Sequence, residues 1–238
     1  MEWSDMRSAS AFPTTAEMSA ERVTAFLRKV YGWMFIGLAV TAVVASTVAG
    51  SPTLIQHIFS NQFLYIGLIL AELGLVFYLS ARVMTLAPNV AMTLFIVYAA
   101  LNGVTLSFIL LVYTGQSIGT TFLVTAGMFG AMALYGSTTQ RSLAGVGQFF
   151  FMGLIGLVLA SIVGMFWHND ALQFLITVIG VIVFTGLTAW DAQRLKLMAA
   201  TVPEERTGSY AVVGALSLYL NFINLFLMLL RLLGGRRD

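Results

Sequence analysis

Formal charge is scarce in this chain. Only 9% of its 238 residues are charged, whereas 59% are hydrophobic, and the mean hydropathy is +0.90. A soluble domain carries about 25% charged residues, and a surface that faces water cannot be built from so few. The composition therefore excludes an ordinary soluble fold and indicates an integral membrane protein.

Other absences exclude several kinds of site. The chain has no cysteine, which rules out disulfides, thiolate nucleophiles and metal sites built on cysteine. Its two histidines, His57 and His168, are far apart in the sequence and near the ends of predicted helices, so each is more simply a polar loop residue than a metal ligand. A net charge of +2 without a basic stripe argues against a nucleic-acid partner. We predict no metal site and no cofactor.

The N-terminal segment lacks the apolar stretch of a cleaved signal peptide. Residues 1–29 carry eight charges, so the first hydrophobic span must target the chain and remain in the product. The segment is polar and without sustained periodicity, which is typical of disorder. We predict a disordered cytoplasmic tail over residues 1–28 and a transmembrane domain over residues 29–234.

Long intervals without charge define the transmembrane architecture. A helix needs about 20 apolar residues to cross the hydrocarbon, and these runs lack the two-residue alternation of a membrane barrel. The predicted fold class is all-α, with seven transmembrane helices. The predicted spans are 30–49, 62–81, 89–112, 117–136, 146–167, 171–192 and 209–232.

The distribution of cations predicts the orientation. The loops at 50–61, 113–116 and 168–170 hold no lysine or arginine. The positive-inside rule therefore predicts a cytoplasmic N-terminus. The cations on that side are Arg7, Arg22, Arg28, Lys29, Arg82, Arg141, Arg194, Lys196 and Arg206.

The C-terminal tail disagrees with this rule. It carries Arg231, Arg236 and Arg237, yet seven full spans place it on the opposite side. A re-entrant last segment is the alternative. We favour a full span because the 24 residues from 207 to 230 carry no charge.

Small residues recur every fourth position in two predicted spans. One set is Gly156, Ala160 and Gly164, and the other is Gly127 with Ala131. This spacing lets helix backbones approach closely in lipid, so we predict tight helix contacts at both places.

Only two of the ten carboxylates, Glu72 and Asp191, fall within predicted spans. Glu72 is near the middle of the second span, about 15 Å along the helix from Arg82, which is too far for an ion pair. A carboxylate in the bilayer centre is costly, so Glu72 should face the bundle interior. It is either a hydrogen-bonding partner of a neighbouring helix or part of an ion pathway.

Asp191 follows 20 uncharged residues in the stretch FTGLTAWDAQRLK, near the cytoplasmic end of the sixth span. Two interpretations are open. The aspartate pairs with Arg194 three residues later, or it turns into the bundle and is shared with another helix.

The last span offers a partner for such a carboxylate. Tyr210, Gly214, Ser217, Asn221 and Asn224 follow one another at steps of four, three, four and three residues, which puts them on one helix face. A polar face does not point at lipid, so we predict that this helix is central and that the few buried polar groups converge on it. The stripe serves either interhelical hydrogen bonds or a polar lining.

Four stretches together resemble the Bax inhibitor-1 family, also called the transmembrane Bax-inhibitor-motif family, in its bacterial branch. They are FLRKVYGWMFIGLAVTA, TAGMFGAMALYGSTTQRSL, FTGLTAWDAQRLK and ALSLYLNFINLFLMLLRLLG. The resemblance implies seven helices with the last one central. It also implies calcium leak across a membrane with pH-dependent gating, or modulation of a membrane-bound AAA protease.

The resemblance further implies a pH sensor made of two aspartates, one on each of the last two helices. Asp191 matches the first, but Asn221 stands where the second is expected and does not titrate. We interpret Asp191 and Asn221 as a pH-sensing latch with a single titrating group. Glu72 and Arg82 look like the family's acidic and basic positions on the second helix. The predicted pore or ion-pathway residues are Glu72, Arg82, Ser217 and Asn224.

Three functions compete at this stage. The first is a pH-sensitive leak pathway for cations, with calcium as the ion, in the bacterial inner membrane. The second is a regulator that binds a membrane-bound AAA protease or other membrane proteins without transporting ions. The third, an intramembrane enzyme, is not expected, because the GxGD pattern is absent and no nucleophile is paired with a base.

Overall fold

The computed structural model describes residues 15–82, 85–167 and 169–237. Seven of its helices are long and apolar enough to cross a membrane, and each corresponds to one predicted span. The elements in order are α1 (Thr15–Ala49), α2 (Pro52–Ser60), α3 (Gln62–Arg82), α4 (Pro88–Val112), α5 (Gly115–Thr138), α6 (Ala144–Phe166), α7 (Asp170–Ala199), the 3₁₀ turn η2 (Glu204–Arg206) and α8 (Thr207–Leu233). The chain is a multi-pass membrane protein, as predicted.

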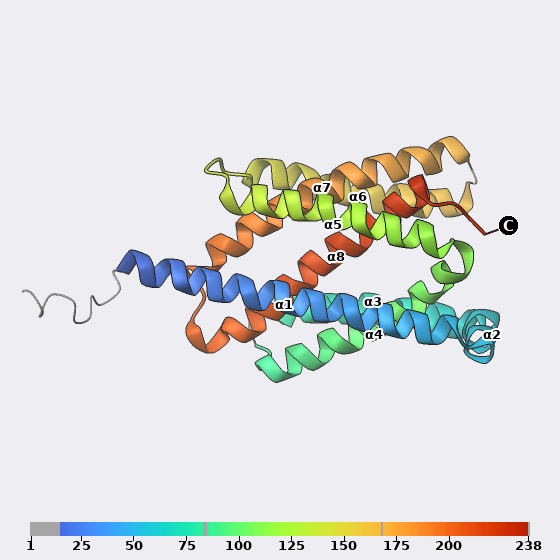
Figure 1. Cartoon of the computed structure of the whole chain (residues 1–238), viewed down its shortest axis with the longest axis horizontal. Helices are drawn as coiled ribbons and strands as arrows, with labels where there is room; N and C mark the ends of the chain where they lie inside the picture. The colour runs from blue at the N-terminus through green and yellow to red at the C-terminus, as the bar shows by residue number, and fades with distance from the viewer. Residues whose placement is uncertain (1–14, 83–84, 168, 238) are drawn as a thin grey trace, which may run out of the picture.

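Helix α8 is the central element. One layer contains α1 to α4, the other contains α5 to α7, and α8 crosses between them (Figure 1). It packs against α1, α4, α5 and α7. Within the apolar window of α8, 67% of the residues are buried inside the protein, against 6–39% for the other six spans. The predicted central position of the last helix is confirmed.

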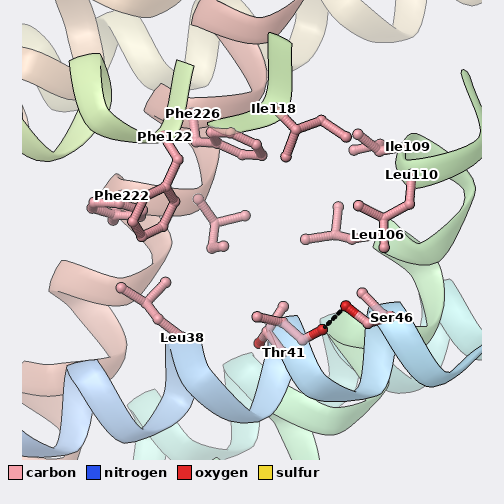
Figure 2. Close-up of a pocket in the computed structure, with 13 residues that line it drawn as sticks. Leu38, Thr41, Ser46, Leu106, Ile109, Leu110, Ile118, Phe122, Phe222 and Phe226 are labelled. Carbon is pink, nitrogen blue, oxygen red and sulfur yellow. Dashed lines mark hydrogen bonds between the residues drawn. The ribbon is translucent and has the colours of Figure 1, made fainter. Parts of the chain in front are cut away.

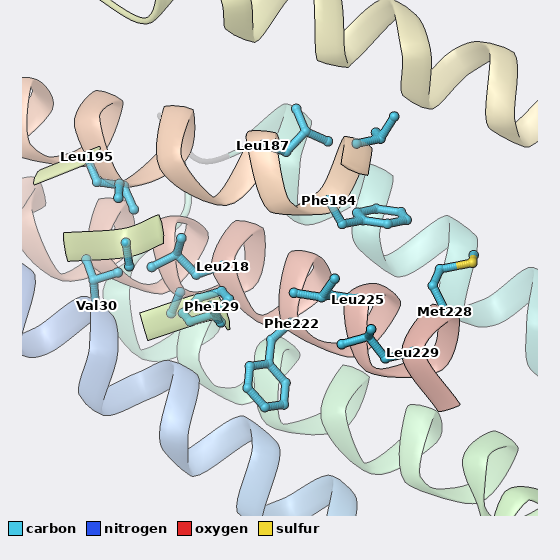
Figure 3. Packing of buried hydrophobic residues seen from close by; sticks show 14 of the residues in the cluster. Val30, Phe129, Phe184, Leu187, Leu195, Leu218, Phe222, Leu225, Met228 and Leu229 are labelled. Atoms are coloured by element: carbon cyan, nitrogen blue, oxygen red, sulfur yellow. The ribbon is translucent and has the colours of Figure 1, made fainter. Parts of the chain in front are cut away.

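Apolar side chains of α8 form the main core. Leu218, Phe222, Leu225 and Leu229 are buried, and Figure 3 shows them facing side chains from several other helices. These partners come from α7, α5 and α1 and include Phe184, Leu187, Leu195, Phe129 and Val30. Packing of this kind stabilises helix association in lipid, where apolar burial supplies little driving force.

The prediction of disorder over residues 1–28 is wrong for residues 15–28, while residues 1–14 lie outside the described part. Helix α1 begins at Thr15. Phe26 and Val30 are 2% and 0% exposed, and Arg22 Nη2 donates to Val202 O at 3.1 Å. These contacts explain the order, because they tie a polar segment to the α7–α8 connection.

One helix was not predicted. Residues expected to form a loop make the nine-residue helix α2, which starts with Pro52 and buries none of its residues. It lies at the end of the bundle (Figure 1), as interfacial helices do.

The C-terminal tail lies at the opposite end of the bundle from the start of α1 (Figure 1). Arg237 N donates to Val112 O at 2.9 Å, and Gly235 N donates to Ser117 Oγ at 2.9 Å. The tail is therefore held against the connection between α4 and α5. The last segment spans the bundle completely and is not re-entrant, which agrees with the favoured prediction.

The predicted close contacts at small residues are mostly misplaced. A Cβ added at Gly127 or Gly156 would meet nothing within 4 Å, so neither glycine serves a tight contact. Gly164 does face a neighbour, Gln173. The tightest approach is at Gly136, where α5 meets the backbone of Ala189 on α7 and leaves no room for a Cβ. The spacing of small residues says nothing about which side of a helix has a neighbour.

Candidate functional site

Asp191 joins α7 to the central helix. Its residue is 4% exposed, and its Oδ2 accepts two hydrogen bonds from α8, from Ser217 Oγ and from Asn221 Nδ2, both at 2.8 Å. Hydrogen bonds to an ionised carboxylate are about twice as strong as neutral ones. The predicted pair of Asp191 and Asn221 is therefore in contact, with Ser217 as a third member.

The second carboxylate oxygen of Asp191 faces a cation. Arg194 Nη2 lies 3.0 Å from Asp191 Oδ1, and the guanidinium carbon lies 5.1 Å from the ring centroid of Trp190. No donor among the described residues satisfies hydrogen-bond angles at Oδ1, so this contact is an ion pair only. Both interpretations that the sequence left open hold at once, because Asp191 pairs with Arg194 and is also shared with α8.

Local helix geometry explains this arrangement. Residues 191 and 194 are three apart on α7, and residues 217 and 221 are four apart on α8, so each pair lies on one face. Helix α7 continues to Ala199, eight residues beyond Asp191 and about 12 Å along the axis. The predicted end of this span at residue 192 is seven residues too early, and the aspartate lies well inside the helix.

A cavity of about 440 Å³ adjoins the carboxylate's partners. Its lining includes Arg194 from α7 and Ser217 from α8, and Tyr210 and Ser80 add further hydroxyl groups. The rest of the lining is Phe151, Leu195, Met198, Val213, Gly214, Leu216 and Leu220. Two of the groups that hold Asp191, those of Arg194 and Ser217, therefore line this cavity.

Glu72 is bonded to a different helix from the one expected. Thr105 Oγ1 donates to Glu72 Oε1, and Asn102 Nδ2 donates to Oε2 at 3.3 Å. Both donors are on α4. The expectation that Glu72 turns toward a neighbouring helix holds, but the expectation that all buried polar groups converge on α8 is wrong. Which helix Glu72 contacts depends on how α3 is rotated relative to α4. This rotation cannot be predicted from the spacing of residues in the sequence.

A second polar contact on α8 was not predicted. The hydroxyls of Tyr219 and Thr41 are 2.7 Å apart, and Thr41 Oγ1 also donates to Ala99 O at 2.9 Å. The Tyr219 ring packs edge-on against Phe95 and Tyr98, with centroids 5.8 and 5.9 Å away. Thr41 and Tyr219 carry no charge and lie within hydrophobic stretches, so a prediction based on charged residues does not include them.

Two predicted pathway residues remain apart from Asp191. Arg82 is exposed in the last turn of α3. Asn224 Nδ2 donates to Leu220 O within its own helix at 2.8 Å. Among the described residues, the hydrogen bonds and ion pair of Asp191 and Glu72 do not include either side chain.

Residues just beyond Asp191 fix the connection between α5 and α6. Gln193 Oε1 accepts from Leu143 N and its Nε2 donates to Arg141 O, both at 2.8 Å. Lys196 Nζ donates to Ser137 O at 2.7 Å. A cation at the end of α5 also suits the helix dipole. The run DAQRLK therefore contacts α8 through Asp191, the α5–α6 connection through Gln193, and α5 through Lys196. Within this run the sequence predicted a role only for Asp191 and Arg194.

Comparison with known proteins gives the same family as the motifs. The family model described as inhibitor of apoptosis-promoting Bax1 matches residues 23–238. The inner membrane protein YbhL of Escherichia coli K12 is 52% identical over 215 residues, which cover 89% of this chain and 92% of that protein. An uncharacterised protein of Borreliella burgdorferi is 46% identical, with 90% and 93% covered. An uncharacterised membrane protein of Streptococcus pyogenes is 37% identical over the same shares of the two chains. The chain therefore belongs to the Bax inhibitor-1 family.

Proposed function

We propose that this protein is a pH-sensitive leak pathway for cations, with calcium as the ion, in the bacterial inner membrane. The observation that carries the proposal is the shared carboxylate, since Asp191 Oδ2 accepts from both Ser217 and Asn221 of α8. This contact joins α7 to the helix at the centre of the bundle. We extend the predicted latch of Asp191 and Asn221 to include Ser217, and we assign the closed state of the pathway to it.

The latch depends on the charge of Asp191. An ionised carboxylate accepts charge-assisted hydrogen bonds and pairs with Arg194, whereas a protonated one loses both advantages. The contribution of the latch is therefore present while Asp191 is ionised and is lost as the pH falls. Because Asn221 does not titrate, a single group controls the response, and the coupled titration of two close carboxylates does not occur.

Access to the latch comes from the end of the bundle that holds most cations. Arg194 and Ser217 line the adjoining cavity, and α8 starts at this end. The positive-inside rule makes this end cytoplasmic, with the N-terminus on the same side. A fall in cytoplasmic pH is then the signal that opens the pathway.

Glu72 is the candidate group that meets the ion deeper in the membrane. The side chains of Asn102 and Thr105 donate hydrogen bonds to it, so a carboxylate, an amide and a hydroxyl lie together. Oxygen ligands of this kind suit calcium. One carboxylate makes a weak site, as a leak requires, because a tightly held ion does not leave.

Calcium uptake into proteoliposomes tests the proposal. Asn221→Ala and Ser217→Ala should each raise uptake at neutral pH several-fold, because a latch bond of about 1 kcal/mol corresponds to roughly fivefold in an equilibrium. Asn224→Ala is the matched control for the latch, since this asparagine is on the same helix but donates to Leu220 O and not to Asp191, so it should leave the pH dependence of uptake unchanged. Glu72→Gln should reduce uptake without changing its pH dependence.

The same experiment separates the competing function. If neither the wild type nor any latch variant raises uptake above that of empty liposomes, the leak proposal fails. The regulator hypothesis then gains weight, and its test is whether a membrane-bound AAA protease co-purifies with the full chain but not with a chain that lacks residues 2–20.

A further inference from the structure

A second cavity, of about 230 Å³, lies on the other side of α8 and is apolar (Figure 2). Phe222 and Phe226 of α8 line it, together with Leu106 of α4 and Ile118 and Phe122 of α5. Helix α1 completes the wall with residues that include Ala42 and Ser46. No residue of the Asp191 latch takes part, so this cavity is independent of the proposed function.

The mouth of the cavity faces sideways, toward the surrounding membrane. Ala42, Ser46 and Phe122 at its rim are exposed, whereas Phe222 and Ile223 at its back are buried. The rim residues belong to α1 and α5, which are in different layers of the bundle (Figure 1). Both rim helices are membrane spans, so the opening meets hydrocarbon and not water.

A pair of arginines is anchored at the same end of the bundle. The backbone of the tail is bonded to Val112 O and Ser117 Oγ, which fixes the segment that carries Arg236 and Arg237. Ser117 directly precedes Ile118, a residue of the cavity wall. Both arginine side chains are exposed.

The geometry points to a binding site for one anionic phospholipid, with an acyl chain in the apolar cavity and the phosphate beside Arg236 and Arg237. An acyl chain gains little by moving from the bilayer into the cavity, because the two environments are equally apolar. Selectivity must therefore come from the headgroup, where each nearby arginine attracts an anionic lipid. The bound chain fills the space between α1 and α5 that no side chain of the described residues occupies.

Native mass spectrometry of the purified full chain, titrated with phosphatidylglycerol or phosphatidylcholine, tests this site. One phosphatidylglycerol should be retained about tenfold or more tightly than phosphatidylcholine, since two cations contribute. Arg236→Gln with Arg237→Gln should remove that preference. The control is Arg82→Gln with Arg141→Gln, which neutralises two exposed arginines at the other end.

A second variant tests the cavity itself. Ala42→Trp places a large side chain at the exposed mouth and should abolish retention of the tight lipid. Ala39→Trp is the matched control, because Ala39 is also exposed on α1 but does not line the cavity. Equal retention of the two lipids by the wild type overturns the proposal. So does a preference that survives the double arginine change, or tight binding that survives Ala42→Trp.

Discussion

Two polar contacts in the middle of α8 differ in charge and in surroundings. On one face, Asp191 accepts from Ser217 and Asn221 beside a cavity with polar groups in its wall. On another face, the hydroxyl of Tyr219 meets that of Thr41, and the Tyr219 ring is 0% exposed among aromatic neighbours. Both contacts satisfy polar groups in a medium that offers no water.

The difference assigns separate roles to the two contacts. The aspartate contact involves a charged group and adjoins a cavity whose lining includes Arg194 and Ser217. The tyrosine contact is neutral and enclosed by Phe95 and Tyr98. We infer that the tyrosine contact holds α8 to α1 and α4 permanently, while the aspartate contact to α7 is reversible.

The largest expected effect is on the permanent contact. Tyr219→Ala should lower the free energy of unfolding by about 3–5 kcal/mol, because it leaves a cavity among aromatic side chains. Unfolding of the variant in detergent micelles measures this. Phe77→Ala, which removes an exposed aromatic side chain from α3, is the control and should have a much smaller effect.

The next effect concerns the reversible contact. Asp191→Asn keeps the shape of the side chain but removes its charge, so the latch should lose about 1–3 kcal/mol. Calcium uptake at neutral pH should rise to the level that the wild type reaches in acid, and its pH dependence should disappear. An Asp191→Asn protein that retains the pH response of the wild type would show that another group senses the proton.

A smaller effect is expected when the tyrosine hydroxyl alone is removed. Tyr219→Phe keeps the ring packing and loses one neutral interhelical hydrogen bond, worth about 0.6 kcal/mol in a membrane protein. Stability should fall by that amount, and the pH response of calcium uptake should be unchanged. A shift in the pH response would mean that the two faces of α8 do not act separately.

The smallest effect is expected at the loop that follows the latch. Gln193→Ala removes two hydrogen bonds that hold the α5–α6 connection, one of them exposed to water and the other partly buried. We expect a loss of at most about 0.5 kcal/mol. Hydrogen exchange of residues 139–143 should increase, whereas calcium uptake should stay at the wild-type level.

The seven spans could be predicted because hydrocarbon requires long charge-free helices, and this demand is local in the sequence. The polar face of the last span, which includes Ser217 and Asn221, followed from helical periodicity, whereas the pairing of Asn221 with Asp191 followed from the resemblance to the family. Helix α2 was missed because its polar and apolar residues are mixed and nothing in it is buried.

Other features depend on how helices rotate against one another. The α4 partners of Glu72 and the close contact at Gly136 are set by three-dimensional packing, which no spacing rule encodes. The hydrogen bond between Thr41 and Tyr219 was not predicted, because neither residue carries a charge. Sequence therefore identified which groups need partners better than it identified those partners.

The most direct test of the latch is a double-mutant cycle between Asp191→Ala and Asn221→Ala, with the free energy of unfolding measured at neutral pH. We predict a coupling energy of about 1–2 kcal/mol, because an amide that donates to a carboxylate forms a charge-assisted hydrogen bond. Additive effects of the two substitutions would contradict the latch.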